Sequence, residues 1–476
     1  MNQDSSSLIS ILRRAIKAVP AVKYALSVGG FTAVIAIFQA FNVGFESGIL
    51  VCGVVLALMA LLIIFANLAA NDKGSFHFPA LVLTWVSLIS VMVGAPALFF
   101  SVFNGLPLDL KSVFLGKEAA PPVADFPLPG KHMPANTSTP ASSPETSTYA
   151  TIKVFYATDR KASGSLEPAL FYSGERSNFD TLSLGTVNVS IPEDHRVGEI
   201  ERPTWWRLEF HEDPEKHVVL LSVTPDSDDE FYSSLSGTIA KSTNREAFVF
   251  IHGYDVSFAD AARRTAQLAY DLVFDGAPIL YSWPSKGELK DYPADEASVE
   301  WSTPHLKGFL ESIATISHAH TVHLIAHSMG NRALTASLNE ISKEHSGLPA
   351  MFKQVLLAAP DVDVGVFKHL AQNFPAVAER VTLYASSKDD ALIASKKFHA
   401  YPRAGESRTI SALAPRVDTI DATAVDTQFL GHSYYGDNRS ILSDIFYVIR
   451  DGKPPSQRFG MRPNNPTTPT YWIFRP

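Results

Sequence analysis

The feature that most constrains the fold is an alternation of short apolar runs with longer amphipathic stretches, which begins at residue 247. The runs AFVFIHG, APILYSW, VHLIAHS and QVLLAAPDVD are separated by stretches with helical spacing. Runs of Val, Ile and Leu bounded by turn residues are typical of strands that are buried on both faces. The alternation therefore predicts an α/β domain with a mainly parallel sheet and helices on both of its faces.

Three earlier segments also predict strands. They are IKVFYATDR at 152–160, LSLGTVNVSIP at 182–192 and VVLLSVTP at 218–225. We therefore expect one folded domain over residues 151–476. Functional groups of such a domain gather at the carboxyl ends of the parallel strands.

The N-terminal part of the chain has a different character. It contains three windows without a formal charge, at 24–45, 47–71 and 74–108. Each window is long enough to cross a hydrocarbon core of ~30 Å, which takes roughly 20 helical residues. The sequence therefore predicts three transmembrane helices within residues 24–104. A cleaved signal peptide is the alternative for the first window, but that window exceeds the usual ~7–15 apolar residues.

Basic residues set the expected orientation of these helices. Four Lys or Arg residues lie between residues 13 and 23, and the positive-inside rule places such a segment, residues 1–23, in the cytoplasm. Three spans then place the C-terminal domain outside the cytoplasm. We expect a multi-pass protein of the cytoplasmic membrane, with the lipid bilayer as a partner and a periplasmic or otherwise extracytoplasmic domain.

Residues 105–150 are predicted to form a linker. Between residues 119 and 150 the chain has seven prolines, many Ser and Thr residues and few large apolar ones, and such a composition cannot bury enough surface to fold. About 30 flexible residues span on the order of 30 Å. The domain that follows is therefore expected to stay near the bilayer.

Composition bears on two further features, disulfides and nucleic-acid binding. The single cysteine, Cys52, rules out an intramolecular disulfide. A net charge of -8 without a long basic run gives no support for nucleic-acid binding.

Ser328 lies where a predicted strand meets a predicted helix, in the pentapeptide AHSMG at 326–330. A nucleophilic serine on a sharp strand-to-helix turn needs small neighbours, so that the strained residue can project into the site. Alanine stands at the first position, where the usual pattern has glycine, and alanine is still small. We predict that Ser328 is a nucleophile; the alternative is a serine at which a strand merely ends.

A serine hydroxyl is a weak nucleophile, so it needs a base and the base needs an orienting acid. The expected order along the chain is serine, acid, histidine. Asp389 and Asp390 follow the predicted strand RVTLYAS, and His432 lies in a glycine-flanked loop before a helical stretch. The sequence therefore predicts a triad of Ser328, His432 and one of these two aspartates.

The oxyanion of an acyl-transfer reaction needs backbone N–H donors. We expect one from Met329, directly after the nucleophile, and one from Tyr254, after the FVFIHG strand. Four neighbouring residues are candidates for the pocket wall, and the alternative is a role in packing and turns alone: His252, Gly253, Trp283 and His327.

Several alternatives remain at this point. Asp361 and Asp363 follow the preceding strand and are alternative acids. Ser433 lies in a Gly-x-Ser run, but no buried strand leads into it. The segment HEDPEKH has histidines six residues apart with a proline between them, which does not fit the four-residue spacing of a helical zinc motif. We therefore expect no metal.

Together these segments resemble a bacterial α/β-hydrolase family that is known only as a domain of unknown function. The resemblance rests on VFYATDR, FIHGYDVSFADAARRTAQLAYDL, YSWPSKG, AHSMGNRAL, APDVD, YASSKDDAL and GHSYY. It implies the α/β-hydrolase fold and serine hydrolase activity without a cofactor, and its S-x-x-D-x-A-L spacing selects Asp389 over Asp390 as the acid. The chain departs from the family pattern at Asp255, where Asn is common.

The sequence as a whole predicts a membrane-anchored serine hydrolase that cleaves an ester, small or lipid-like, through an acyl-enzyme. A hydrolase-like binding or scaffolding module without turnover is the alternative from another class of protein. A serine peptidase is the alternative among enzymes, because the same groups can cleave an amide.

Overall fold

The computed structural model describes a few N-terminal residues and most of the C-terminal region. The described residues are Val55, 58–63, Thr84, Ser87, 148–179, 181–203, Glu209, 211–286, 291–345, Gly347, 349–387, 401–407, 416–425, 439–465 and 470–475. The chain divides into two compact units, Met1–Gly130 and Lys131–Pro476.

In the first unit the described residues are helical: Val55, 58–63, Thr84 and Ser87. Among the described residues, no helix has the length and apolar character needed to cross a membrane. Most of the three predicted spans and of the predicted linker lies outside the described residues. The spans and the linker therefore stay predictions.

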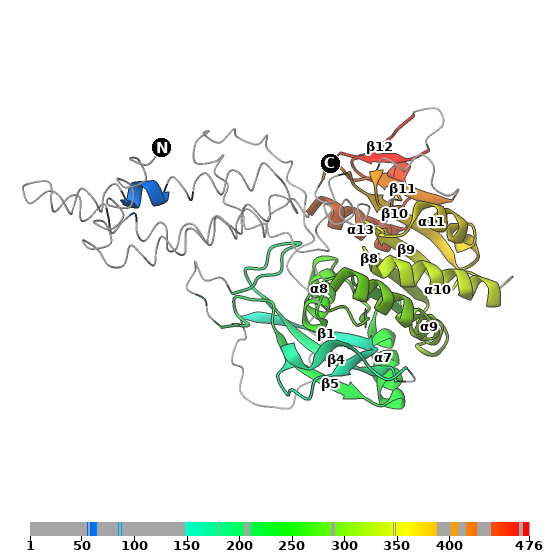
Figure 1. Cartoon of the computed structure of the whole chain (residues 1–476). Helices are drawn as coiled ribbons and strands as arrows, with labels where there is room; N and C mark the ends of the chain where they lie inside the picture. Colours follow the sequence, from blue (N-terminus) through cyan, green and yellow to red (C-terminus); the bar gives the residue numbers. More distant parts are fainter. Residues whose placement is uncertain are drawn as a thin grey trace, which may run out of the picture. The chain divides into compact units, whose positions relative to one another are not determined.

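The second unit is built on a large sheet, to which eleven of the described strands belong (Figure 1). Across the sheet the strands are β12 (Met461–Pro463), β13 (Trp472–Phe474), β11 (Val417–Asp421), β10 (Ala378–Ala385), β9 (Phe352–Ala358), β8 (Thr321–His327), β6 (Glu246–Ile251), β7 (Ala277–Ser282), β1 (Tyr149–Thr158), β4 (Ser183–Pro192) and β5 (Leu220–Asp226). Two short strands, β2 (Arg160–Ala162) and β3 (Tyr172–Arg176), pair with each other.

The sheet is parallel in its centre and antiparallel at its edges. All neighbours from β1 through β7, β6, β8, β9, β10 and β11 to β13 pair in parallel. The pairs β1–β4, β4–β5 and β12–β13 are antiparallel. The predicted mainly parallel sheet is thus confirmed, and β1 begins at Tyr149, two residues before the expected start of the domain.

Helices cover both faces of this sheet. Their bounds are α7 (Asp228–Lys241), α8 (Phe258–Asp271), α9 (Tyr292–Ile316), α10 (Gly330–Glu344), α11 (Val364–Ala371) and α13 (Arg439–Asp451), with short 3₁₀ turns at Pro168–Leu170, Phe374–Ala376 and Pro455–Gln457. Side chains of α7, α9, α10 and α11 share one hydrophobic cluster with the sheet, and side chains of α8 and α13 share another. The expected three-layer α/β arrangement is therefore present.

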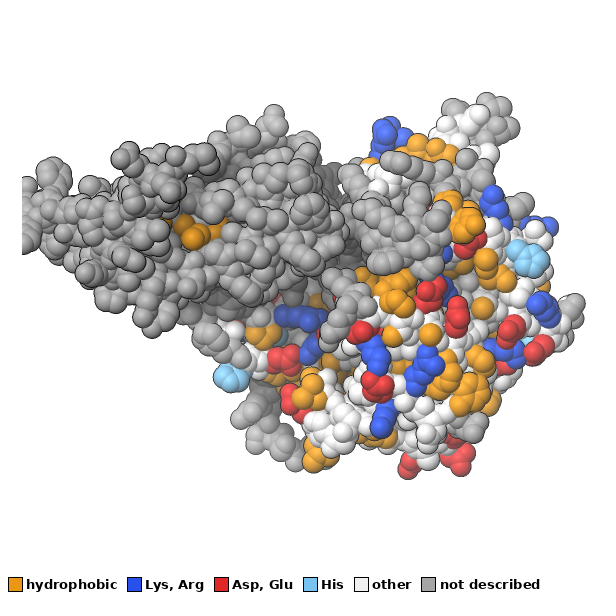
Figure 2. Space-filling view, in the orientation of Figure 1, with side chains coloured by type: hydrophobic (Ala, Val, Ile, Leu, Met, Phe, Trp, Pro, Cys, Tyr) orange, Lys and Arg blue, Asp and Glu red, His pale blue; other side chains and the backbone are white. Residues whose placement is uncertain are grey.

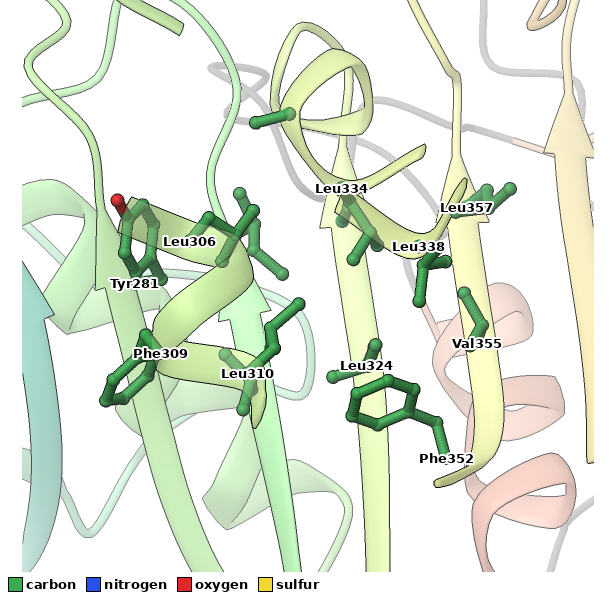
Figure 3. Packing of buried hydrophobic residues seen from close by; sticks show 14 of the residues in the cluster. Tyr281, Leu306, Phe309, Leu310, Leu324, Leu334, Leu338, Phe352, Val355 and Leu357 are labelled. Carbon is green, nitrogen blue, oxygen red and sulfur yellow. The ribbon is translucent and has the colours of Figure 1, made fainter. Parts of the chain in front are cut away.

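The two clusters exist because successive strand residues point to opposite faces. Leu324 and Val355 face α9 and α10, where Leu310 and Leu338 pack against the sheet (Figure 3). Ile325 and Leu356, the next residues along, belong to the cluster under α8 and α13. Each large side chain buried in this way stabilises the fold by roughly 1.5–3 kcal/mol relative to an exposed one.

In the sequence, helical spacing is visible over residues 299–316, VEWSTPHLKGFLESIATI. Helix α9 begins earlier than this stretch. Its first residue is Tyr292, and Pro293 lies in its first turn, where the missing N–H of proline leaves no hydrogen bond unmade. The apolar spacing becomes regular only farther along the helix, so the pattern locates its middle better than its start.

The described surface carries both signs of charge. Figure 2 shows acidic and basic side chains interspersed with small hydrophobic areas over the visible face.

Candidate active site

Ser328 stands between β8 and α10 in a conformation that few non-glycine residues adopt. Its φ is 48°, and a left-handed backbone conformation of this kind costs of order 1–3 kcal/mol. Its N–H donates to the Ala358 carbonyl oxygen at 3.0 Å, and its own carbonyl oxygen accepts from Asn331 Nδ2 at 3.0 Å and from the Asp361 N–H at 3.2 Å. A strained serine held by its surroundings at a strand end is the geometry of a nucleophile elbow.

Glycines near Ser328 allow the backbones to approach one another closely. A Cβ on Gly330 would lie 2.3 Å from the carbonyl oxygen of His252. A Cβ on Gly253 would lie 3.0 Å from Ser328 Cβ and 2.8 Å from His327 Nδ1. The loop after β6 therefore lies directly beside the candidate nucleophile, and the contacts leave little space for a side chain at either glycine.

Ala326 occupies the position at which the usual motif has glycine. It is fully buried and pairs with Ile251 on one side and Leu357 on the other. Its methyl group belongs to the hydrophobic cluster that also contains Leu334 of α10. The sheet and α10 thus accommodate an alanine two residues before the elbow.

The two predicted oxyanion donors belong to segments that meet at Ser328. Met329 immediately precedes α10, and its N–H makes no hydrogen bond to another described residue. The first N–H groups of a helix have no intrahelical acceptor and lie at the positive end of its dipole. Tyr254 follows Gly253, whose backbone lies beside Ser328.

Four neighbouring strands end level with one another at this edge of the sheet. His327 pairs with Ala358, Ala358 with Tyr384, and Tyr384 with Ile420. Since neighbouring strands are ~4.8 Å apart, the end of β10 lies on the order of 10 Å from the end of β8. The described ends of β10 and β11 therefore lie at the same edge of the sheet as Ser328.

The predicted acid and base follow these two strands. Asp389 and Asp390 come after β10, and His432 lies between β11 and α13. All three residues, and the rival Ser433, lie outside the described residues. The triad therefore stays a prediction.

Asp361, one of the alternative acids, is bound by other groups. It is almost fully buried, and its carboxylate accepts a hydrogen bond from the Tyr292 hydroxyl. Arg332 lies 3.4 Å from one carboxylate oxygen and Arg403 lies 3.2 Å from the other. Burial opposes the charge of Arg332, but Asp361, Tyr292 and Glu296 together raise its pKa above the ordinary value.

Asp363, the other alternative, caps a helix. Its Oδ1 accepts from the N–H groups of Gly365 at 2.8 Å and Val366 at 3.0 Å at the start of α11. An N-cap aspartate of this kind typically stabilises its helix by ~1 kcal/mol.

His252 and Trp283, two candidates for the pocket wall, are buried against each other. Their rings stack with centroids 5.0 Å apart and an interplanar angle of 13°, and Trp283 Nε1–H donates to the His252 carbonyl oxygen at 2.8 Å. Burial, and next the charge of Arg160, hold the pKa of His252 well below its ordinary value. Both rings therefore support the loop after β6, and His252 is neutral.

His327, a third candidate, is the last residue of β8 and is partly exposed. The close approach of its Nδ1 to the Gly253 backbone places it under the same loop. It thus lies next to Ser328 in the chain and next to Gly253 in space.

Two residues at this edge carried no predicted role. Asp295, in the first turn of α9, accepts from Ser285 Oγ at 2.5 Å, from the Lys286 N–H at 2.8 Å and from the Asp255 N–H at 3.3 Å. Burial raises the pKa of this carboxyl. Arg160, the first residue of β2, lies 3.2 Å from His252 Nε2. In the sequence, Asp295 carries no motif signal, and Arg160 is only the last residue of the predicted strand IKVFYATDR.

His217 and a group of three side chains are potential metal ligands among the described residues, and in both places the ligand atoms contact other protein groups. His217 Nδ1 accepts from the Asp213 N–H at 3.0 Å and its Nε2 lies 3.2 Å from Glu209. One group of three potential ligands is found among the described residues, Glu311, Glu344 and His345. Lys307 lies between its two carboxylates at 3.1 and 2.7 Å and neutralises much of their charge.

Residues 227–450 match the model of one protein family, described as Alpha/beta hydrolase of unknown function (DUF900). The matched region contains the elbow and every predicted triad residue, whereas β1 to β5 and Arg160 precede it. No curated protein matches the chain, and no solved structure does. Residues 227–450, which contain β8, Ser328 and α10, are therefore similar to this α/β-hydrolase family, and the mainly parallel sheet with helices on both faces agrees with that fold.

Proposed function

We propose that the protein is a membrane-anchored serine hydrolase that cleaves a carboxylic ester through an acyl-enzyme. The family match supports a hydrolase. The single observation that carries the serine mechanism is the φ of 48° at Ser328, between β8 and α10. Such strain persists only where the surroundings hold it, and it clusters at active sites.

In the first half of the reaction, Ser328 Oγ attacks the acyl carbonyl carbon while His432 takes the hydroxyl proton. Asp389 orients His432 and stabilises its positive charge. The N–H groups of Met329 and Tyr254 donate to the oxyanion of the tetrahedral intermediate. The carbon–oxygen bond to the alcohol then breaks, and His432 returns the proton to the leaving alkoxide.

In the second half, His432 removes a proton from water as the water attacks the acyl-enzyme. The second tetrahedral intermediate collapses, the bond to Ser328 Oγ breaks, and the serine recovers its proton from His432. The products are an alcohol and a carboxylic acid, and no cofactor is required.

The substrate class follows from the N-terminal region. Three uncharged windows and a proline-rich segment precede the hydrolase region, and a tether on the order of 30 Å keeps the site near a bilayer. An ester with a lipid-like acyl chain is therefore the substrate that the arrangement favours.

Hydrolysis of a p-nitrophenyl ester series, from acetate to palmitate, tests this proposal. The purified full-length chain in detergent is compared with Ser328→Ala and His432→Ala, and Ser433→Ala serves as the matched control. We expect the first two variants to lose on the order of 10³-fold or more in kcat and the control to retain activity. A preference for the longer chains would support the lipid-like substrate.

Two outcomes would contradict the proposal. A folded wild-type chain without turnover on any ester would favour a binding module. Loss of activity in Ser433→Ala with retention in Ser328→Ala would show that Ser433, not Ser328, is the nucleophile.

A further inference from the structure

A buried arginine contacts the loop after β6, which contains Tyr254, the predicted oxyanion donor. Arg160, the first residue of β2, is 1% exposed and lies before the region that matches the family. Its Nη2 is 2.7 Å from the Val256 carbonyl oxygen and 3.2 Å from His252 Nε2. It therefore contacts both ends of the segment from His252 to Val256.

The surroundings of Arg160 are unusual for a buried cation. Its Nε donates to Ser282 Oγ at 2.8 Å, and its Nη1 donates to the carbonyl oxygens of Ser285 at 2.9 Å and Ser173 at 3.3 Å. No carboxylate of a described residue lies within ion-pair distance of it. Burial lowers the pKa of Arg160 to about 10, so it remains charged at neutral pH. A buried charge without a direct counter-ion is expensive for the fold.

The partners of His252 determine which of its ring nitrogens carries the proton. Nδ1 lies 2.7 Å from the Gly253 carbonyl oxygen, which can only accept, so Nδ1 is protonated. Nε2 lies 3.2 Å from the Arg160 guanidinium and 3.2 Å from Ser282 Oγ, which can both donate, and 3.1 Å from the Trp283 carbonyl oxygen, which can only accept. The Gly253 contact at 2.7 Å is shorter than the Trp283 contact, and a proton on Nε2 would lie beside a cation, so the neutral ring with hydrogen on Nδ1 is the form that the contacts favour on balance.

This hydrogen bond fixes the direction of a peptide group. The Gly253 carbonyl and the Tyr254 N–H belong to the same peptide unit, and in a trans peptide the two point in opposite directions. Holding the carbonyl toward His252 therefore turns the Tyr254 N–H away from His252. The same peptide lies beside Ser328, because a Cβ on Gly253 would come 3.0 Å from Ser328 Cβ.

We propose that Arg160 is a positioning residue for the oxyanion hole: it holds the His252 ring in the form that bonds the Gly253 carbonyl, and so it orients the Tyr254 N–H. This inference rests on the proposed serine hydrolase function. It assigns a role to the small strand pair β2–β3 and its surroundings, because Arg160 is the first residue of β2.

Replacement of His252 by two amides of different length tests the hydrogen bond itself. In His252→Asn the side-chain nitrogen takes the place of Nδ1 and can still donate to Gly253, whereas in His252→Gln it takes the place of Nε2. Full removal of an oxyanion donor lowers kcat ~10²–10³-fold. We expect kcat for p-nitrophenyl ester hydrolysis to fall at least about tenfold more in His252→Gln than in His252→Asn, with KM little changed in both.

Arg160→Met, measured on the full-length chain, tests the arginine. Its matched control is Arg458→Met, which removes another fully buried arginine, bonded to Asp444 at 3.1 Å under α13. We expect both variants to have a lower melting temperature than the wild type. Only Arg160→Met should also lower kcat, about 10–100-fold, without a comparable rise in KM. Arg160→Lys, which keeps the charge, should recover part of the loss.

The outcomes separate the two proposals. Equal kcat values in the Asn and Gln variants, or an Arg160→Met chain that matches Arg458→Met in kcat, would overturn the positioning role while wild-type activity stands. A wild-type chain without activity would overturn the proposed function and this inference together. If Arg160→Met fails to fold, the comparison of the two His252 variants decides.

Discussion

The backbone N–H of Asp361 donates to the carbonyl oxygen of Ser328 at 3.2 Å, so a buried ion-pair centre lies directly beneath the elbow. Arg332 adds a second connection, because its Nε donates to the Asp361 carbonyl oxygen at 2.8 Å. The carboxylate of Asp361 is bound by Tyr292, Arg332 and Arg403. Asp361 thus holds the turn on which Ser328 stands.

The substitution Asp361→Asn should therefore lower stability, whereas Asp389→Asn should lower catalytic activity. Removing one partner of a buried ion pair costs ~3–5 kcal/mol, so Asp361→Asn should lower the free energy of unfolding on this scale while folded molecules retain most of their activity. Asp389→Asn should lower kcat on the order of 10⁴-fold, because the histidine loses its orienting acid. Denaturant titration and ester hydrolysis measure the two effects. The reverse pattern would make Asp361 the triad acid.

Gly253→Ala should disable the site without a large loss of the fold. The added methyl group would meet Ser328 Cβ at 3.0 Å and His327 Nδ1 at 2.8 Å, so the loop after β6 must move away from the elbow. We expect kcat to fall at least about tenfold, since an oxyanion donor is displaced.

Gly237→Ala is the control for that change. Gly237 lies within α7, and a Cβ there would meet nothing within 4 Å. Alanine is favoured over glycine in a helix by ~0.5–1 kcal/mol. This variant should therefore have a slightly higher melting temperature and an unchanged kcat. Equal kcat values for the two alanine variants would show that the Gly253 loop is not part of the site.

The stability of the domain should fall as the pH rises from about 6.5 to about 9. His195 lies 2.9 Å from Glu201 and 3.0 Å from Asp271; burial opposes its charge, but its hydrogen bonds to Asp271 and Glu201 raise its pKa to about 9. A pKa that is higher in the folded state contributes stability below the unfolded pKa, and this stability is lost as the pH passes the folded pKa.

The size of this effect follows from the shift, from 6.5 to about 9. At 1.36 kcal/mol per pH unit it amounts to about 3 kcal/mol. Chemical denaturation at a series of pH values checks it, with His195→Gln as the comparison. If the pH dependence between 6.5 and 9 is the same in both chains, His195 is not its source.

The sequence predicted the centre of the fold because local patterns determine it. Runs such as VHLIAHS carry a strand signal in the residues themselves and in the turn residues around them, and a small-residue turn between a strand and a helix locates Ser328 without knowledge of the packing. The partners of Asp361 could not be found in this way. Tyr292, Arg332 and Arg403 approach it from separate elements of the chain, and only the packing of α9 and α10 on the sheet brings them together.

Arg160 illustrates the same limit. In the sequence it is one arginine at the end of a predicted strand, and its role depends on contacts with Ser282, His252 and Val256, which lie far along the chain. His252 and Trp283 were expected as candidates for a pocket wall, since they follow strands at the functional edge. Their mutual stacking depends on the pairing of β6 with β7, which the sequence does not state.

Covalent labelling tests most directly whether Ser328 is the nucleophile. The full-length chain is treated with a fluorophosphonate, digested, and the modified peptide is located by mass spectrometry. We expect one phosphonylated serine, Ser328, and no labelling in Ser328→Ala. An adduct on Ser433, or a folded chain that remains unlabelled, would contradict this prediction.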